Sequence, residues 1–250
     1  MVHQRGYQHH LLREYSALKE EKGRTQKFKK IFRTLQRFQP GKPFLKCLDI
    51  GCSSGIITSL LGEHFLEAIG IDIDREAVQY AKRHFSSQNV QFLLADSMAL
   101  PFKKETIEVI ICNHVYEHVP DAKQMMREIH RVLKGGGFCY FSAANKYKIT
   151  EGHYNLPFLS WVPKHLAHFY LKVTGKGNFY YEEHLSLQGL KKLVKGFEIH
   201  DYTLPIIRDP EDFFASDVLN GQSFLYKWIH WLAPYLYPWI PTYIWVLTKK

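Results

Sequence analysis

Short apolar runs of strand length alternate along residues 45–145 with stretches whose apolar positions recur at helical spacing. The runs predict strands at 45–50, 68–73, 90–94, 107–113 and 138–143, and the periodic stretches predict helices at 56–65, 75–85 and 122–133. Strands that alternate with helices build a parallel sheet with helices on both faces. The pattern therefore predicts an α/β fold with a doubly wound, mostly parallel sheet.

The regular alternation stops after Asn145. Residues 146–181 are rich in aromatic residues, His and Pro, which is typical of a cap. Ser186 is expected to cap a helix that runs through Val194. A strand at 198–204, a second insertion at 206–241 and an antiparallel last strand at 243–248 complete the predicted order. Because both insertions follow strands, we expect them to roof the carboxyl edge of the sheet, where open α/β folds bind ligands.

The first 44 residues are expected to form a basic helical segment that precedes a main domain of residues 45–250. Residues 1–46 contain twelve Lys or Arg and three Glu, so all of the formal net charge of +9 lies in this part of the chain. The apolar residues Phe28, Ile31, Phe32 and Leu35 recur there at helical spacing. The plain interpretation is a helix with a solvated basic face, and the alternative is attraction to an anionic lipid or substrate.

Composition restricts the class of protein. The chain has 250 residues, 46% hydrophobic and 23% charged, which is close to the average of globular domains and excludes disorder and collagen. Its four cysteines lack C-x-x-C spacing and indicate neither a disulfide framework nor a zinc ribbon. The N-terminus lacks the apolar core of a secretion signal, and no apolar run reaches the roughly 18 residues of a membrane span. We therefore expect a cytoplasmic protein, soluble or peripheral at a membrane.

The strongest chemical signal is the string LDIGCSSG at residues 48–55, where a predicted strand passes through a loop of small residues into a helix. Gly51 and Gly55 permit close backbone approach by a ligand, and the helix N-terminus offers free N–H groups. Asp72 ends the next strand, 21 residues after Gly51, where an acidic side chain accepts hydrogen bonds from ribose hydroxyls. Asp96 follows the third strand, so three strand ends converge on one nucleoside-like ligand.

Two other interpretations of this loop are weaker. A dinucleotide site requires G-x-G-x-x-G, but Ser53 replaces the second glycine and the outer pair are four positions apart. The string also satisfies G-x-S-x-G, the nucleophile elbow of α/β hydrolases, with Ser53 as nucleophile. That elbow normally follows several strands, whereas a basic helical segment precedes it here. Both alternatives are disfavoured.

At these residues the chain resembles the class I S-adenosylmethionine-dependent methyltransferases, which have a Rossmann-like fold, and particularly the group that includes the ubiquinone and menaquinone biosynthesis methyltransferases. The resemblance implies that the loop after the first strand contacts the methionine and ribose part of S-adenosylmethionine, that Asp72 binds the ribose, and that Asp96 lies next to the adenine. The implied cofactor-binding residues are Asp49, Gly51, Cys52, Ser53, Gly55, Asp72, Ile73, Asp96, Ser97 and Asn113.

The implied reaction needs few catalytic groups. The methyl group on a sulfonium is already activated, so the enzyme aligns the acceptor, excludes water and removes a proton where required. His114 and His118, in the segment after the fourth strand, are candidate general bases because imidazole titrates near neutral pH. His184, before the late helix, is a further candidate. For each histidine, local capping or packing is the alternative.

His114 to His118 also form H-x-x-E-H, a metal-ligand spacing when one helix carries it. Certain quinone-pathway O-methyltransferases are similar there through a metal-binding E-x-x-E-H string. Because a strand precedes the segment and Pro120 follows it, no long helix is expected and no metal site is assigned. The [DN]-P-P-[YF] string of nucleic-acid amino-methyltransferases lacks both prolines here, so a nucleic-acid partner is not expected.

The second insertion contains residues 224–232, which are apolar nearly all round the helix and are followed by Pro234 and Pro238. A lid helix buried against the sheet is one interpretation, and a surface for lipid or a lipid substrate is the other. Trp228, Trp231 and Trp239 suit an interface, and the basic N-terminus would attract anionic lipid. Together they favour a small-molecule acceptor that is hydrophobic or lipid-linked. A non-catalytic cofactor-binding or membrane-adaptor protein is the alternative function.

Overall fold

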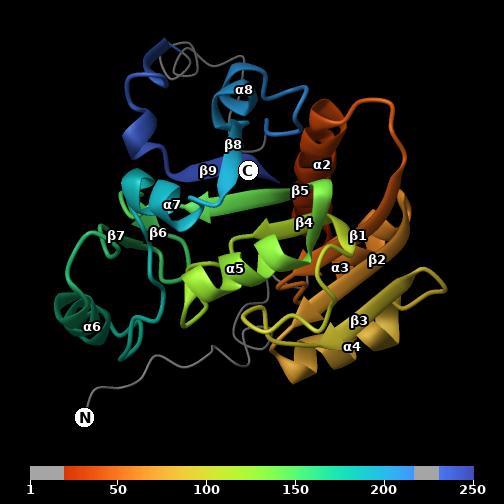
Figure 1. Ribbon diagram of the computed structural model, residues 1–250. Helices are drawn as coiled ribbons and strands as arrows, with labels where there is room; N and C mark the ends of the chain where they lie inside the picture. Colours follow the sequence, from red (N-terminus) through yellow and green to blue (C-terminus); the bar gives the residue numbers. More distant parts are fainter. Residues whose placement is uncertain (1–19, 217–230) are drawn as a thin grey trace.

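A computed structural model describes residues 20–216 and 231–250, and its centre is a seven-stranded sheet with helices on both faces (Figure 1). The strands are β1 (Phe44–Ile50), β2 (Phe65–Asp72), β3 (Val90–Leu94), β4 (Ile107–Asn113), β5 (Leu133–Ala144), β8 (Phe197–Asp201) and β9 (Thr242–Lys249). Their order is β3-β2-β1-β4-β5-β9-β8, and β9 is antiparallel to both of its neighbours. The expected Rossmann-like fold with an antiparallel last strand is confirmed.

Helices cover both faces of the sheet. They are α2 (Glu21–Phe38), α3 (Ile56–Gly62), α4 (Arg75–Phe85), α5 (Ala122–Val132), α6 (Lys164–Val173), α7 (Leu187–Leu193) and α8 (Thr203–Arg208). Apolar residues of α2, α3 and α4 share one core cluster with one face of the sheet, and residues of α5 and α7 share the other. Helix α6 lies apart from the sheet in the first insertion. A strand covered on both faces is apolar where it is covered, which explains the apolar runs at residues 109–112 of β4 and 138–141 of β5.

Helix starts follow the capping residues in the sequence. The side chain of Asp74 accepts hydrogen bonds from the backbone of Glu76 and Ala77 at the start of α4, and Asp121 caps α5 in the same way. Ser186 accepts from Gly189 N at the start of α7, as the sequence predicted. Such caps satisfy N–H groups that have no partner within the helix.

Two predicted elements end early. The helix expected at 56–65 ends at Gly62, and β2 begins at Phe65. A Cβ at Gly62 would lie 2.2 Å from Val90 Cγ2, so the close packing of this turn on β3 sets the boundary. The strand expected at 198–204 ends at Asp201, whose side chain accepts from Thr203 N and starts α8. In both cases a local contact ends the element before the apolar pattern does.

The two insertions contact each other beyond the sheet edge. The first contains the short strands β6 (Thr150–Glu151) and β7 (Leu156–Pro157) and helix α6, which pack around a small apolar cluster of their own. In the second, the ring of Trp239 lies 5.0 Å from that of Tyr147 and 5.9 Å from that of Trp161. Most of the aromatic stretch 224–232, with Trp228, lies outside the described residues. In the part of the chain that the structure describes, no helix has the length and apolarity of a membrane span.

Gly55→Ala is expected to lower the free energy of unfolding by roughly 2–4 kcal/mol. The residue has φ +83°, and its new Cβ would lie 2.6 Å from Ala81 Cβ and 2.8 Å from Phe92 Cε1. Gly135→Ala is the matched control, because nothing lies within 4 Å of a Cβ there. Urea denaturation followed by circular dichroism measures both variants. Equal stabilities would show that the packing around Gly55 is not close.

Candidate functional site

A cavity of about 570 Å³ opens at the carboxyl ends of β1, β2 and β4, a volume typical of ligand sites. One part of its wall comes from the loops after these strands and from α2, and another part comes from the first insertion. The residues of the wall on which the argument depends are Arg24, Gly51, Ser53, Asp72, Ile73, Ser97, Asn113, His114, Val115, Glu117, His118, Val119, Ala144, Lys148, His153 and Pro241. Residues far apart in the sequence thus face one space.

The loop after β1 is held by the carboxylate at the end of β2. Asp72 Oδ2 accepts from Ser53 N at 2.8 Å, and Oδ1 accepts from Asp74 N at 2.9 Å. Burial raises the pKa of Asp72, while these two hydrogen bonds oppose the shift. Gly51 has φ +72°, and a Cβ there would lie 2.9 Å from Val115 Cγ2. Only glycine fits the loop where it passes the segment after β4.

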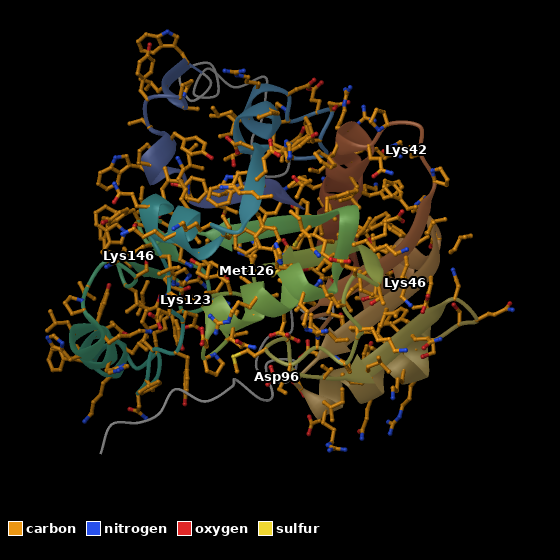
Figure 2. The ribbon with its side chains drawn as sticks, in the orientation of Figure 1. Lys42, Lys46, Asp96, Lys123, Met126 and Lys146 are labelled. Carbon is orange, nitrogen blue, oxygen red and sulfur yellow. The ribbon has the colours of Figure 1, made fainter. Side chains whose placement is uncertain are left out.

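Four of the residues predicted to bind the cofactor, Asp49, Cys52, Gly55 and Asp96, are not among the residues that line the cavity. Asp49 is buried, accepts from Thr58 Oγ1 at 2.6 Å, and has its pKa raised to about 7 by burial. Cys52 is also buried, and the space beside Gly55 is filled by Ala81 and Phe92. Asp96 lies in the loop after β3 (Figure 2), where its Oδ1 accepts from Met98 N at 2.7 Å. The other six predicted residues, Gly51, Ser53, Asp72, Ile73, Ser97 and Asn113, line the cavity.

The sequence analysis missed Arg24, which helix α2 brings to the cavity wall near Asp49 and Asp72. Arg24 is only 9% exposed, and its Nε has no hydrogen-bond partner among the described residues. Burial lowers the pKa of its guanidinium, while the charges of Asp49 and Asp72 oppose the shift. Arg24 stands four residues before Phe28 and therefore continues the apolar face of the helix. This spacing was the available signal for its burial.

His114 is held by protein groups at both ring nitrogens. Its Nδ1 lies 3.3 Å from Glu117 Oε1, and its Nε2 lies 3.1 Å from Ser142 Oγ. Its backbone has φ +56°, a conformation that few residues other than glycine adopt. Burial opposes the ionisation of Glu117, but the hydrogen bond from His114 and the neighbouring histidines outweigh it and lower the pKa to about 2. The pair is therefore an imidazole backed by a buried carboxylate.

The other two predicted histidines differ in position. His118 lines the cavity, and burial lowers its pKa. His184 is 8% exposed, lies outside the cavity wall, and has Nδ1 2.9 Å from the hydroxyl of Tyr180. Burial lowers the pKa of His184 to about 3, so its ring is neutral at physiological pH. The segment from His114 to His118 forms turns and no helix.

The first insertion adds charged residues to the wall that the sequence did not single out. Lys148 and His153 line the cavity, and Glu151 is buried behind them. Glu182, which is fully buried, lies just before α7, and its carboxylate contacts the imidazoles of His118 and His153. The abundance of His in the insertion was visible in the sequence, but no spacing connected His153 with Glu182.

Comparisons with known proteins find a methyltransferase domain within the chain. Residues 48–141 match the family model described as a methyltransferase domain. The chain is 30% identical over 101 residues to a ubiquinone biosynthesis O-methyltransferase from Coxiella burnetii, covering 40% of this chain and 43% of that protein. It is also 30% identical over 128 residues to the mitochondrial human enzyme of the same name, covering 48% of this chain and 35% of that protein.

The match to these curated relatives thus spans less than half of their length. A crystal structure of a protein from Pyrococcus horikoshii superimposes with a TM-score of 0.65 at 16% identity, covering 98% of this chain and 100% of the other. At this identity the likeness concerns the fold alone. The family match lies on β1 to β5, the part that contains the loops after β1, β2 and β4.

Arg24→Ala is expected to weaken the binding of S-adenosylmethionine by about 1–3 kcal/mol, because a buried guanidinium that faces the site would no longer pair with the carboxylate of the cofactor. Asp72→Ala is expected to cause a loss of similar size by removing the acceptor for the ribose hydroxyls. Calorimetric titration measures both, with Lys22→Ala on the exposed face of α2 as the control. Unchanged affinity in the folded Asp72 variant would contradict the ribose assignment.

Proposed function

We propose that this chain, which carries a class I S-adenosylmethionine-dependent methyltransferase domain, transfers a methyl group to a small acceptor that is hydrophobic or lipid-linked. The observation that carries the proposal is the shared cavity, in which the loops of the methyltransferase domain and the first insertion line one space. The relatives named above act on ubiquinone precursors according to their names, and the acceptor of this chain is inferred from its own cavity.

The residues at the cofactor end fit S-adenosylmethionine. Asp72 offers a carboxylate to ribose hydroxyls, Gly51 brings the loop backbone to the cavity wall, and Arg24 supplies a positive charge for the carboxylate of the methionine part. When bound, the cofactor supplies a methyl group that its sulfonium already activates. The protein then has to bind the acceptor in line with this group and keep water out.

Apolar side chains also line the cavity. They are Val115, Val119, Ala144 and Pro241. Apolar side chains bind a hydrophobic acceptor through burial of its surface, and they exclude water that would compete with the acceptor. These walls support an acceptor with an apolar body and one polar reacting atom.

We assign proton removal to His114, with Glu117 as its partner. Glu117 remains ionised, so it stabilises the positive charge that the imidazole gains when it accepts a proton. The hydroxyl of Ser142 holds Nε2 until an acceptor hydroxyl replaces it. His184 packs with Tyr180 away from the cavity and receives no catalytic role.

His114→Asn tests this role, because Asn tolerates the positive φ of His114 but cannot accept a proton at neutral pH. We expect turnover to fall by roughly 10²–10⁴ with almost unchanged cofactor affinity. The assay measures transfer of a labelled methyl group from S-adenosylmethionine to a total lipid extract, and His84→Asn on exposed α4 is the control. Equal losses of turnover and affinity would make His114 part of the cofactor wall. Cofactor binding without any transfer would favour the non-catalytic adaptor.

We propose an anionic membrane surface as a partner of the insertions. Large apolar side chains are exposed there, including Trp231, Tyr235 and Trp239 of the second insertion at 61%, 75% and 52%. Such side chains bind at the boundary between headgroups and acyl chains. The basic helix contributes less than its charge suggests, because Arg33 and Arg37 of α2 pair with Asp212 within the chain. The remaining lysines supply the electrostatic attraction.

Trp231→Ala combined with Tyr235→Ala is expected to reduce binding to anionic vesicles in sedimentation, at every salt concentration, because apolar insertion does not depend on salt. The wild-type protein is expected to bind less as salt rises, since each Lys or Arg near the surface contributes about 1 kcal/mol. Leu66→Ala, which removes a side chain 72% exposed at the start of β2, is the control. Failure of the folded wild-type protein to bind anionic vesicles at low salt would refute the proposal.

A further inference from the structure

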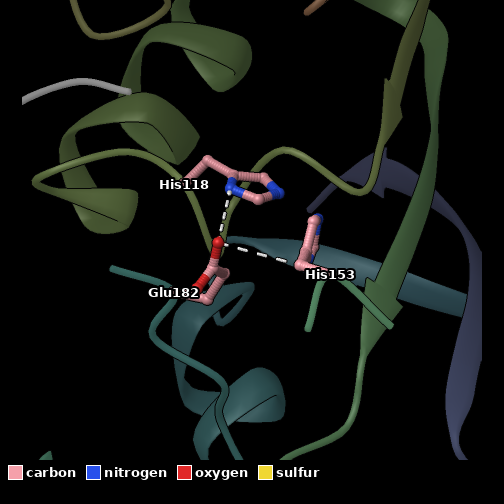
Figure 3. Close-up of side chains that lie close together, drawn as sticks. All are labelled: His118, His153 and Glu182. Atoms are coloured by element: carbon pink, nitrogen blue, oxygen red, sulfur yellow. Dashed lines mark ion pairs between the residues drawn. The ribbon is translucent and has the colours of Figure 1, made fainter. Parts of the chain in front are cut away.

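Three metal-ligating side chains from separate segments meet beside the acceptor end of the cavity. His118 lies in the turn after β4, His153 follows β6 in the first insertion, and Glu182 lies between α6 and α7. Figure 3 shows both imidazoles next to the carboxylate of Glu182. One ligand atom from each residue lies within 4.8 Å of the other two. We propose that these three residues bind a divalent transition-metal ion.

The distances are close to those of a metal centre. Glu182 Oε1 lies 3.9 Å from Nδ1 of His118 and 4.0 Å from Nδ1 of His153. Bonds of about 2.0–2.2 Å to a zinc ion place two of its ligand atoms at most about 4.4 Å apart. Both distances meet this limit. All ligand atoms of the group lie within 4.8 Å of one another. A small rotation of a side chain would bring the widest pair within the limit of about 4.4 Å.

The donor set selects the class of ion. Two imidazoles and one carboxylate suit Zn²⁺, Fe²⁺, Co²⁺ or Mn²⁺, whereas Mg²⁺ and Ca²⁺ prefer oxygen ligands throughout. A site with three protein ligands leaves at least one coordination position for water or a substrate. His118 and His153 line the cavity, so that position would face the acceptor end.

The surroundings hold His153 in place. Glu151 Oε1 lies 3.0 Å from Nδ1 of His153, and its Oε2 accepts from the backbone N–H groups of His153 and Tyr154 at 2.8 and 3.0 Å. Lys148 pairs with Glu151 at 2.8 Å. Nδ1 is also the atom of His153 that lies 4.0 Å from Glu182 Oε1, so an ion bound there would replace the contact with Glu151 Oε1. The hydrogen bonds from the backbone to Oε2 and the pair with Lys148 would still hold Glu151 beside the ring.

Charge balance favours a cation between these groups. Glu182 is fully buried, and a buried carboxylate is costly unless positive charge compensates it. A proton on His153, between Glu151 and Glu182, is the competing source of that charge. Binding of a metal ion would release that proton, so the two arrangements differ measurably.

A metal ion here would also restrict which atom of the acceptor receives the methyl group. This extension rests on the proposed methyl transfer. An ion bound by these three residues at the acceptor end of the cavity would polarise an oxygen of the acceptor and lower the pKa of a hydroxyl bound to it. The accepting atom would then be an oxygen. Because His153 and Glu182 lie outside the matched residues 48–141, the site would be a property of this chain's insertion and of the segment before α7.

The test is titration of the full chain with Zn²⁺ and Co²⁺ after treatment with a chelator, in the absence of S-adenosylmethionine. We expect one ion per chain by calorimetry, a measured binding enthalpy that differs between buffers because protons are released, and a visible Co²⁺ spectrum with nitrogen ligands. Glu182→Gln and His153→Ala are each expected to weaken binding at least about tenfold, since each removes one of three ligands. His165→Ala, on the exposed face of α6, is the matched control and is expected to bind as the wild type.

Thermal unfolding distinguishes the loss of a metal ligand from a loss of folding in a variant. Zn²⁺ is expected to raise the melting temperature of the wild type and of the His165 variant but not of the Glu182 variant. Absence of binding at millimolar Zn²⁺ would overturn the proposal and favour a proton on His153 as the charge that compensates Glu182. Loss of binding in His114→Asn but not in His153→Ala would place the ion on the segment 114–118 and also overturn it. Metal binding without methyl transfer would contradict only the proposed function.

Discussion

The cavity depends on one constraint of the sheet: β1 and β4 lie side by side at its centre, and the chain leaves them in opposite directions. After β1 it passes through α3 to β2, and after β4 it passes through α5 to β5 on the other side. A crevice must form where the order reverses, because no connection covers it. The contact between Gly51 and Val115 shows how closely the loops after the two strands approach. Every cofactor-facing group described above lies at this reversal or is brought to it.

Buried charge gives the cavity its chemistry. Arg24 faces the carboxylates of Asp49 and Asp72 at one end, and Glu117, Glu151 and Glu182 lie among histidines and Lys148 at the other. Such groups are expensive to bury, and each is compensated by hydrogen bonds or by opposite charge. The two ends therefore differ in character: a positive charge among carboxylates suits a zwitterionic cofactor, and imidazoles backed by carboxylates suit proton transfer or metal binding.

The two ends also have different structural origins. The matched methyltransferase segment supplies the loops of the cofactor end, while the first insertion supplies Lys148 and His153 at the acceptor end. The insertion has its own apolar cluster around Leu159 and Leu171, so it can change without disturbing the sheet. This separation explains why similarity to known enzymes covers the cofactor part and why the acceptor has to be argued from this chain.

The sequence by itself determined the sheet, the order of its elements and the loop of residues 48–55, because strand length, helical period and small-residue turns are local properties of the chain. It also placed Asp72 at the end of a strand, because the apolar run before this residue is visible in the sequence. Tertiary structure alone decided that Asp49 and Gly55 do not line the cavity, that Arg24 reaches it, and that His118, His153 and Glu182 meet. The physical reason is that their proximity results from the packing of a helix and an insertion onto the sheet, and no spacing along the chain encodes it.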